Sequence, residues 1–130
     1  QYLRKNKNMS DQQDYIQELL YTWEETYKKG QLTFWLLLTL RDKTMYVGEI
    51  KEYIEQITMG TVSCEEQSLY RALRKFHKLE IVDFVLKEGN KGPDRKYYFL
   101  TPLGRKLLAE FIERNISVFY QSEVRELLSD

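Results

Sequence analysis

The chain has 130 residues, of which 42% are hydrophobic and 14% aromatic, a composition typical of one globular domain and not of a disordered chain. No apolar run approaches the roughly 18 residues of a membrane span, and the single cysteine excludes an internal disulfide framework. We therefore expect a cytoplasmic protein that does not bind membranes. Twenty basic residues balance 20 acidic ones, so only the distribution of the charges can indicate a partner.

The first residues of the chain are polar and carry no helical pattern. The run MSD at residues 9–11 resembles a natural start, so we expect residues 1–10 to be a disordered leader. We expect residues 11–130 to form one domain. Its three predicted parts are an N-terminal helix at 11–29, a central part at 30–101 and a C-terminal helix at 102–130.

Three helices are predicted in the first half of the chain. In residues 11–29 an apolar or aromatic side chain recurs at every fourth position, at Tyr15, Leu19, Trp23 and Tyr27. Gly30 ends this helix. Residues 31–41 are apolar on nearly every side, which is typical of a helix at the centre of a core or in an interface. Residues 47–59 carry a single apolar stripe, and Gly60 closes that helix.

A fourth helix has the clearest predicted start. Ser63 stands three residues before Glu66, the spacing of a capping box, so the helix should begin at Ser63. The buried stripe of this helix consists of Leu69, Leu73 and Phe76. Its opposite face carries Gln67, Arg71, Arg74, Lys75 and Lys78.

A hairpin and a long helix complete the chain. Residues 81–88 and 95–101 are predicted strands, joined by a turn with the sequence GNKGPD. Thr101 and Pro102 supply an N-cap and a first helical residue for the C-terminal helix. Its apolar positions are Leu103, Leu107, Leu108, Phe111, Ile112, Ile116 and Phe119. The residues leave open whether this helix runs unbroken past residues 115–118.

The order of these parts predicts a mainly α fold with a small β-hairpin, a winged helix-turn-helix with additional N-terminal and C-terminal dimerisation helices. In a winged helix-turn-helix one amphipathic helix enters the DNA major groove, and the hairpin lies beside it. Residues 42–66 carry a net charge of −4, whereas residues 71–96 hold eight basic side chains against four acidic ones. This distribution favours a basic face for phosphate, and a solvated helix face is the alternative.

Three segments resemble one known family: MYVGEI at residues 45–50, SLYRALRKF at 68–76 and GPDRKYYFLTPLGR at 92–105. From about residue 30 to 114 the chain resembles a PadR-type transcriptional regulator, of the shorter branch with one C-terminal helix. The resemblance implies a homodimeric winged-helix repressor that binds a palindromic operator, with C-terminal helices packed across the dimer and release by a small aromatic ligand. The chain departs from the family at residues 63–66, where SCEE replaces a start rich in Ser, Thr, Pro and Gly.

Double-stranded DNA and a second copy of the chain are therefore the expected partners, with a small-molecule effector and no cofactor. The residues expected to contact DNA are Ser63, Gln67, Ser68, Tyr70, Arg71, Arg74, Lys75, Lys91, Arg95 and Lys96. The C-terminal apolar stripe is too long for a winged-helix core to bury alone, so it should pack against a twofold partner. The residues expected at the dimer interface are Leu19, Trp23, Leu108, Phe111, Ile112 and Phe119.

Other functions find less support in the residues. A winged-helix module that binds an acidic protein, without a role in DNA binding, is the alternative that Glu65 and the zero net charge favour. No catalytic triad, phosphate-binding loop or metal motif is present, so we do not expect an enzyme, and His77 has no partner ligands at metal-binding spacing. Cys64 in the first turn of a helix could carry a lowered pKa and sense oxidants, although a small residue without a special role is the favoured interpretation.

Overall fold

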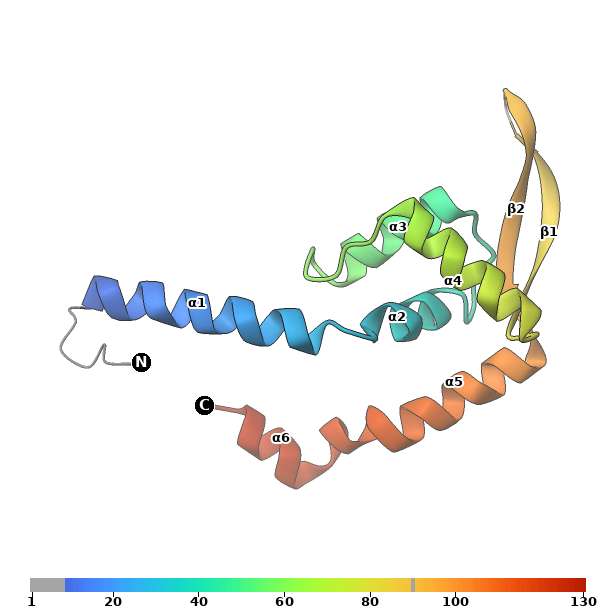
Figure 1. The fold of residues 1–130 in the computed structure, drawn as a ribbon. Coiled ribbons are helices and arrows are strands. Elements are labelled where there is room, and N and C mark those ends of the chain that lie inside the picture. Colours follow the sequence, from blue (N-terminus) through green and yellow to red (C-terminus); the bar gives the residue numbers. More distant parts are fainter. Residues whose placement is uncertain (1–8, 90) are drawn as a thin grey trace. The chain divides into compact units, whose positions relative to one another are not determined.

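The computed structural model of the chain describes residues 9–89 and 91–130. Of the disordered leader expected at residues 1–10, residues 1–8 lie outside the described residues, and the prediction is wrong for residues 9 and 10, which are helical. The chain divides into two compact units, one ending at Leu32 and the other beginning at Thr33 (Figure 1). Within the described residues, no helix combines the length and the apolar character that crossing a membrane requires.

The first unit is dominated by a single long helix, α1, Met9–Tyr27, which begins two residues before the sequence predicted. Its pattern of apolar residues is amphipathic, yet no residue of α1 is buried. Two threonine hydroxyls donate back to carbonyls one turn earlier, Thr22 to Glu18 at 3.1 Å and Thr26 to Thr22 at 3.4 Å. Gly30 follows the helix in the left-handed region, with φ +82°, and so ends it as expected.

The core of the second unit is formed mainly by three helices: α2, Gln31–Thr39, whose first two residues belong to the first unit; α3, Val47–Ile57; and α4, Glu66–Lys78. Two buried threonine hydroxyls support this core by bonding within their own helices, Thr39 to the Trp35 carbonyl and Thr58 to the Ile54 carbonyl, both at 2.7 Å. The fully buried side chains are Leu36, Leu40, Ile50, Ile54, Leu69, Leu73, Val82 and Leu108. The expected buried stripe of α4 is confirmed, since Leu69, Leu73 and Phe76 all lie in this core.

The turn between α3 and α4 differs from the prediction. Helix α3 ends at Ile57, and Met59, not Gly60 alone, occupies the left-handed region with φ +55°. The predicted capping box is wrong, because α4 begins at Glu66 and its N-cap residue, Glu65, makes no side-chain cap. The cause lies upstream: buried Val62 donates its N–H to the Thr58 hydroxyl at 3.2 Å, which holds the chain in the turn up to the following Ser63.

The hairpin, called the wing from here on, consists of β1, Val82–Gly89, and β2, Gly92–Leu100, paired antiparallel. Pairing continues to Gly89 opposite Gly92, so the strands are longer and the tip is shorter than predicted. Met45 adds a bridge on the outer side of β2, because its N–H and carbonyl bond to the carbonyl and N–H of Tyr98 at 3.0 and 2.8 Å.

Helix α5, Pro102–Asn115, follows β2 directly. Its predicted cap is confirmed: the Thr101 hydroxyl accepts from the Gly104 N–H at 3.0 Å and donates to the Glu80 carbonyl at 2.6 Å. The helix does not run unbroken, because a 3₁₀ helix, η1 (Ser117–Tyr120), and a short helix, α6 (Ser122–Leu128), follow it. Six α-helices and a two-stranded hairpin among the described residues confirm the predicted fold class.

Candidate nucleic-acid interface

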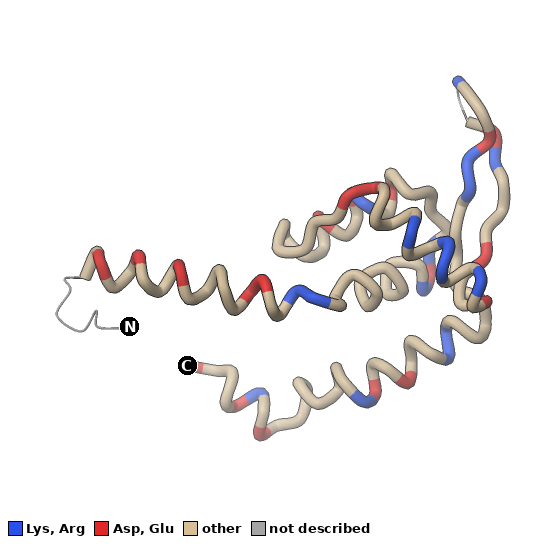
Figure 2. The backbone as a smooth tube through the Cα atoms, viewed as in Figure 1, with Lys and Arg blue, Asp and Glu red and all other residues tan. Residues whose placement is uncertain are grey.

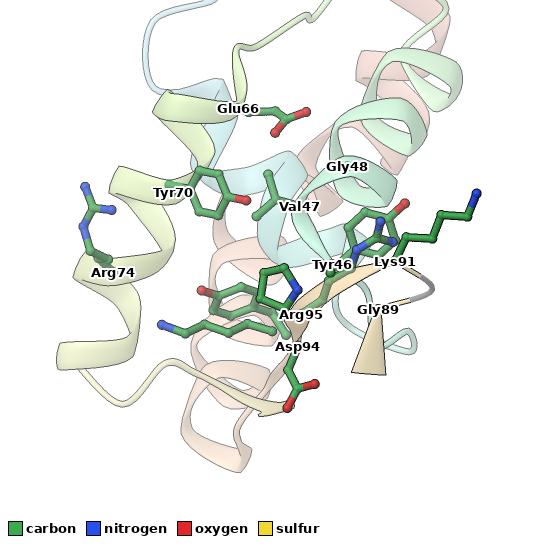
Figure 3. A pocket seen from close by; sticks show the side chains of 14 residues that line it. Tyr46, Val47, Gly48, Glu66, Tyr70, Arg74, Gly89, Lys91, Asp94 and Arg95 are labelled. Carbon is green, nitrogen blue, oxygen red and sulfur yellow. The ribbon is translucent and has the colours of Figure 1, made fainter. Parts of the chain in front are cut away.

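One side of α4 borders a groove of about 610 Å³ that the wing closes on the other side (Figure 3). Glu66, Tyr70 and Arg74 follow one another at intervals of four residues, so they share the side of α4 that faces this groove. The start of α3 contributes Tyr46, Val47 and Gly48 to the groove. The wing contributes Lys91, Asp94, Arg95, Lys96 and Tyr98, among others.

The groove is positively charged. Four cationic side chains line it, Arg74, Lys91, Arg95 and Lys96, against the two carboxylates of Glu66 and Asp94. Figure 2 shows the same distribution at the level of the elements, with basic residues spaced along α4 and on the wing. A concave surface with an excess of cations between a helix and a hairpin attracts phosphate.

Aromatic rings orient the cations of the wing. The Arg95 guanidinium lies over the Tyr46 ring, 4.3 Å from its centroid, and the Lys96 ammonium lies 4.7 Å from the Phe84 centroid. Tyr46 in turn meets Tyr97 edge-on at 5.5 Å. Cation–π contacts leave the charges of Arg95 and Lys96 available, because both side chains remain exposed.

A second hollow, of about 370 Å³, lies along the outer side of α4. Its lining consists of Arg71, Arg74, Lys75, Lys78 and Leu79, so Arg74 borders both hollows. Four cations around one apolar side chain make this the most basic stretch of the helix.

The expected DNA-contact residues thus fall into three groups. The groove brings together Tyr70, Arg74, Lys91, Arg95 and Lys96. The outer hollow brings together Arg71, Arg74 and Lys75. Neither hollow includes Ser63, Gln67 or Ser68: Ser63 is exposed in the turn before α4, Gln67 is exposed and Ser68 is half-buried.

The groove residues that were not expected to contact DNA include Glu66, Tyr46 and Tyr98. Glu66 lines the groove instead of capping α4, and Tyr46 lines it from the position just before α3. Tyr98 lines it from β2, although its side chain is only 4% exposed. Strand alternation places Tyr98 on the inward face of β2 with Leu100, and this pattern carries no sign of the groove that Tyr98 also lines.

The cysteine and the histidine have ordinary surroundings. Cys64 precedes the N-cap of α4, and burial raises the pKa of its thiol above the ordinary value, with the Lys51 ammonium lowering it by less. The raised pKa contradicts the less favoured interpretation of Cys64 as a thiol with a lowered pKa that senses oxidants. The His77 ring lies 5.1 Å from that of Phe84 and 3.4 Å from an Asp83 carboxylate oxygen. Among the described residues, no group of three or more potential ligands could hold a metal ion.

The residues expected at a dimer interface differ in exposure. Leu108 is 2% exposed and belongs to the core of its own chain, and Ile112 is half-buried. Phe111 and Phe119 are 43% and 45% exposed, and Phe111 also meets Phe34 of α2 with 5.5 Å between ring centroids. In the other unit, Leu19 and Trp23 are 51% and 70% exposed.

A helix with a basic outer face beside a paired hairpin defines a winged helix-turn-helix protein. The profile of the "Transcriptional regulator PadR-like family" matches residues 36–110, more than half of the chain. The chain belongs to this family of transcriptional regulators.

Similar proteins agree with this assignment. A PadR-like transcriptional regulator from Bacillus cereus is 27% identical, with a TM-score of 0.63 over 81% of this chain and 98% of that one. PadR from Bacillus subtilis, solved in complex with operator DNA, shares the fold at 21% identity, with a TM-score of 0.58 over 62% of this chain and 46% of that one. An uncharacterized protein from Lysinibacillus sphaericus is 27% identical over 100 residues, which are 77% of this chain and 86% of that protein.

Proposed function

We propose that the chain is a cytoplasmic, homodimeric repressor that binds a palindromic operator in duplex DNA and is released by a small aromatic ligand. One observation carries the proposal: the cations Arg74, Lys91, Arg95 and Lys96 converge from α4 and the wing on a single groove. Membership of the PadR-like family supports a regulatory role, and the operator-bound state of the Bacillus subtilis relative supports DNA as the ligand.

The two hollows beside α4 suit different kinds of contact. Residues on the outer side of α4, with Gln67 and Arg71 foremost, are exposed where a recognition helix meets base edges. Lys91 and Arg95 stand on the wing, which in this fold meets the backbone. We assign base contacts to Gln67 and Arg71, and backbone contacts to Tyr70, Lys75 and the wing. Ser63 and Ser68 remain candidate contacts at the start of α4.

Dimerisation would supply the symmetry that a palindromic operator requires. Phe111 and Phe119 expose large aromatic side chains along the C-terminal segment, and Leu19 and Trp23 do the same on α1. Such side chains are stabilised by burial against a second copy. A twofold dimer places its recognition helices one turn of DNA apart, about 34 Å.

An aromatic cluster supports the aromatic class of effector. Phe34 meets Trp35 edge-on at 5.3 Å and meets Phe111 of α5 at 5.5 Å, and none of the three side chains is fully buried. Exposed faces of such rings can stack on another aromatic molecule. A Trp23→Phe variant leaves Trp35 as the only tryptophan, so its emission, titrated with a panel of small aromatic acids and amines, tests this part of the proposal.

The DNA part is tested by fluorescence anisotropy with two labelled duplexes of equal length, one from upstream of the protein's own gene and one of random sequence. Arg71→Ala should cost roughly 1–3 kcal/mol of binding free energy on the first duplex and reduce the preference for it. Lys91→Gln should weaken binding to both duplexes alike and lower the slope of log K against log salt by about one. Lys106→Gln on α5, exposed and outside both hollows, is the matched control.

A second candidate function is favoured by Glu66, whose carboxylate lines the groove where a phosphate would be repelled. A winged-helix module that binds an acidic or mixed-charge protein segment tolerates this carboxylate better. If the parent protein binds neither duplex at low salt, that module replaces the repressor as the proposed function.

A further inference from the structure

The side chain of Tyr98 is buried, and its hydroxyl makes no hydrogen bond within the described part of the chain. The side chain is 4% exposed, and its ring packs against Phe84 with 5.6 Å between centroids, a contact that a phenylalanine would make equally well. A buried hydroxyl that bonds to nothing costs about 1–3 kcal/mol, and native proteins satisfy nearly all such groups. Because Tyr98 also lines the groove, its hydroxyl can take a partner from there, either water or a ligand.

The surroundings of Tyr98 indicate what that partner is. Tyr98 lines the floor of the groove between α4 and the wing, together with Tyr70 and Arg74 of α4. Burial raises the pKa of the Tyr98 hydroxyl most, the Tyr70 hydroxyl raises it further and the Arg74 guanidinium lowers it, so both α4 side chains lie within electrostatic reach. Two phenols and a guanidinium are all hydrogen-bond donors, and they match a group that only accepts.

The backbone at this point is held rigidly. Tyr98 N–H and carbonyl both bond to Met45, at 2.8 and 3.0 Å, and Tyr98 pairs with Phe84 across the hairpin. The ring of Tyr98 is buried as well, so its hydroxyl has a set position relative to β2. Tyr70 is 43% exposed, so its side chain has room to turn toward a ligand.

We propose that Tyr70, Arg74 and Tyr98 form a binding site for one backbone phosphate of duplex DNA, on the floor of the groove between α4 and the wing. This inference rests on the proposed DNA-binding function and adds a residue and a ligand group to it. A phosphodiester offers acceptor oxygens and one negative charge, which the two phenols and the guanidinium complement. The carboxylates of Glu66 and Asp94 line the same groove, and the ligand must therefore enter between them and the cations.

A phosphate held at this point would connect α4 to β2. Contacts to the DNA backbone set the register and depth of a recognition helix without reading sequence. The Tyr98 contact should therefore contribute equally to operator and random DNA. Because a phenol is neutral, its contribution should leave the salt dependence of binding unchanged, unlike that of Arg74.

Tyr98→Phe tests the site, because it removes one oxygen and keeps the packing. The variant should bind the upstream duplex and the random duplex about tenfold more weakly than the parent, which corresponds to roughly 1.4 kcal/mol. Its melting temperature should stay close to that of the parent, since the ring keeps its contact with Phe84. Tyr97→Phe, the half-buried neighbour on the other face of β2, is the matched control and should bind as the parent does.

A second arm locates the phosphate. Duplexes that carry a neutral methylphosphonate at one backbone position at a time should include one position that weakens the parent about tenfold and leaves Tyr98→Phe nearly unaffected. If the parent binds DNA and Tyr98→Phe binds equally well, the site is wrong while the DNA-binding function stands. If Tyr98→Phe lowers the affinity for the upstream duplex alone, Tyr98 contacts a base, and the phosphate assignment is also overturned. If the parent binds no duplex, the proposed function fails and the site fails with it.

Discussion

The guanidinium of Arg95 lies 4.3 Å from the centroid of the Tyr46 ring, so a cation of the wing rests on the residue that immediately precedes α3. Tyr46 is itself held at both ends: its N–H donates to the Glu49 carboxylate at 3.2 Å, and its ring meets Tyr97 edge-on. This contact joins the helix-turn-helix to the hairpin. It restricts Arg95 to the wall of the groove, where the guanidinium is placed before any ligand arrives.

Tyr46→Leu should weaken binding to all duplex DNA by about three- to tenfold, because Arg95 loses a cation–π contact worth roughly 0.5–1 kcal/mol and its fixed position. Tyr46→Phe keeps the ring and should bind as the parent does. Anisotropy at several salt concentrations measures both variants. The salt slope should stay constant, since no charge is removed; a lower slope in Tyr46→Leu would contradict the positioning role.

Phe111→Glu should convert a dimer into a monomer, because it places a carboxylate in the proposed apolar interface. Removal of the residues after Arg114 should give a monomer or an aggregating chain. Both changes should reduce operator affinity even though Arg71 and Arg74 remain. Light scattering coupled to size-exclusion chromatography measures the mass, and Met59→Glu, a change at a residue 89% exposed in the α3–α4 turn, is the control. A parent protein that is monomeric at high micromolar concentration would rule out both the dimer and the palindromic operator.

Cys64 should behave as an unreactive thiol. Burial raises its pKa, so at neutral pH the folded protein holds less thiolate than an ordinary cysteine does. The rate of reaction with a disulfide reagent, measured against pH, should rise at a higher pH in the folded protein than in the same chain unfolded in guanidinium. A folded-state rate that rises at lower pH would restore the redox-sensing interpretation.

Gly104→Ala should destabilise the second unit by at least about 2 kcal/mol, as overpacking of a tight contact does. A Cβ at this position would lie 2.1 Å from the Ile81 carbonyl oxygen, where the first turn of α5 rests on the end of α4 and the start of the wing. Thermal unfolding should show a melting temperature lower by several degrees, at roughly 4–8 °C per kcal/mol for a unit of this size. Lys106→Ala, an exposed change in the same helix, should leave it nearly unchanged. If Gly104→Ala and Lys106→Ala have the same melting temperature, the backbone at Gly104 can move to make room for the added methyl group.

Local pattern in the sequence was sufficient for the main elements. Leu69, Leu73 and Phe76 are buried as predicted, because the spacing of side chains on one helix follows from the geometry of the helix alone. Thr101 caps α5 as predicted, because an N-cap bond reaches only three residues along the chain. The segments that resemble the PadR-type regulators lie in these same elements, and the family match confirms that interpretation.

Tertiary packing decided the points where the predictions failed or stayed open. Ser63 has the spacing of a capping residue, but burial of Val62 and its bond to Thr58 keep Ser63 outside the helix. Glu66 therefore does not form the predicted capping box with Ser63, and it lines the groove instead. Such outcomes depend on how α3 and α4 dock, which no local pattern encodes.

The candidate site shows the same division. Periodicity alone predicted that Arg71 and Arg74 stand on the outer face of α4, and both are exposed. The alternation of side chains along a strand places Tyr97 and Tyr98 on opposite faces of β2, but it does not say which residues lie opposite them. That Tyr98 lines one groove with Tyr70 and Arg74, within electrostatic reach of both, became visible only in the packed structure, because these side chains come from elements that are far apart in the sequence.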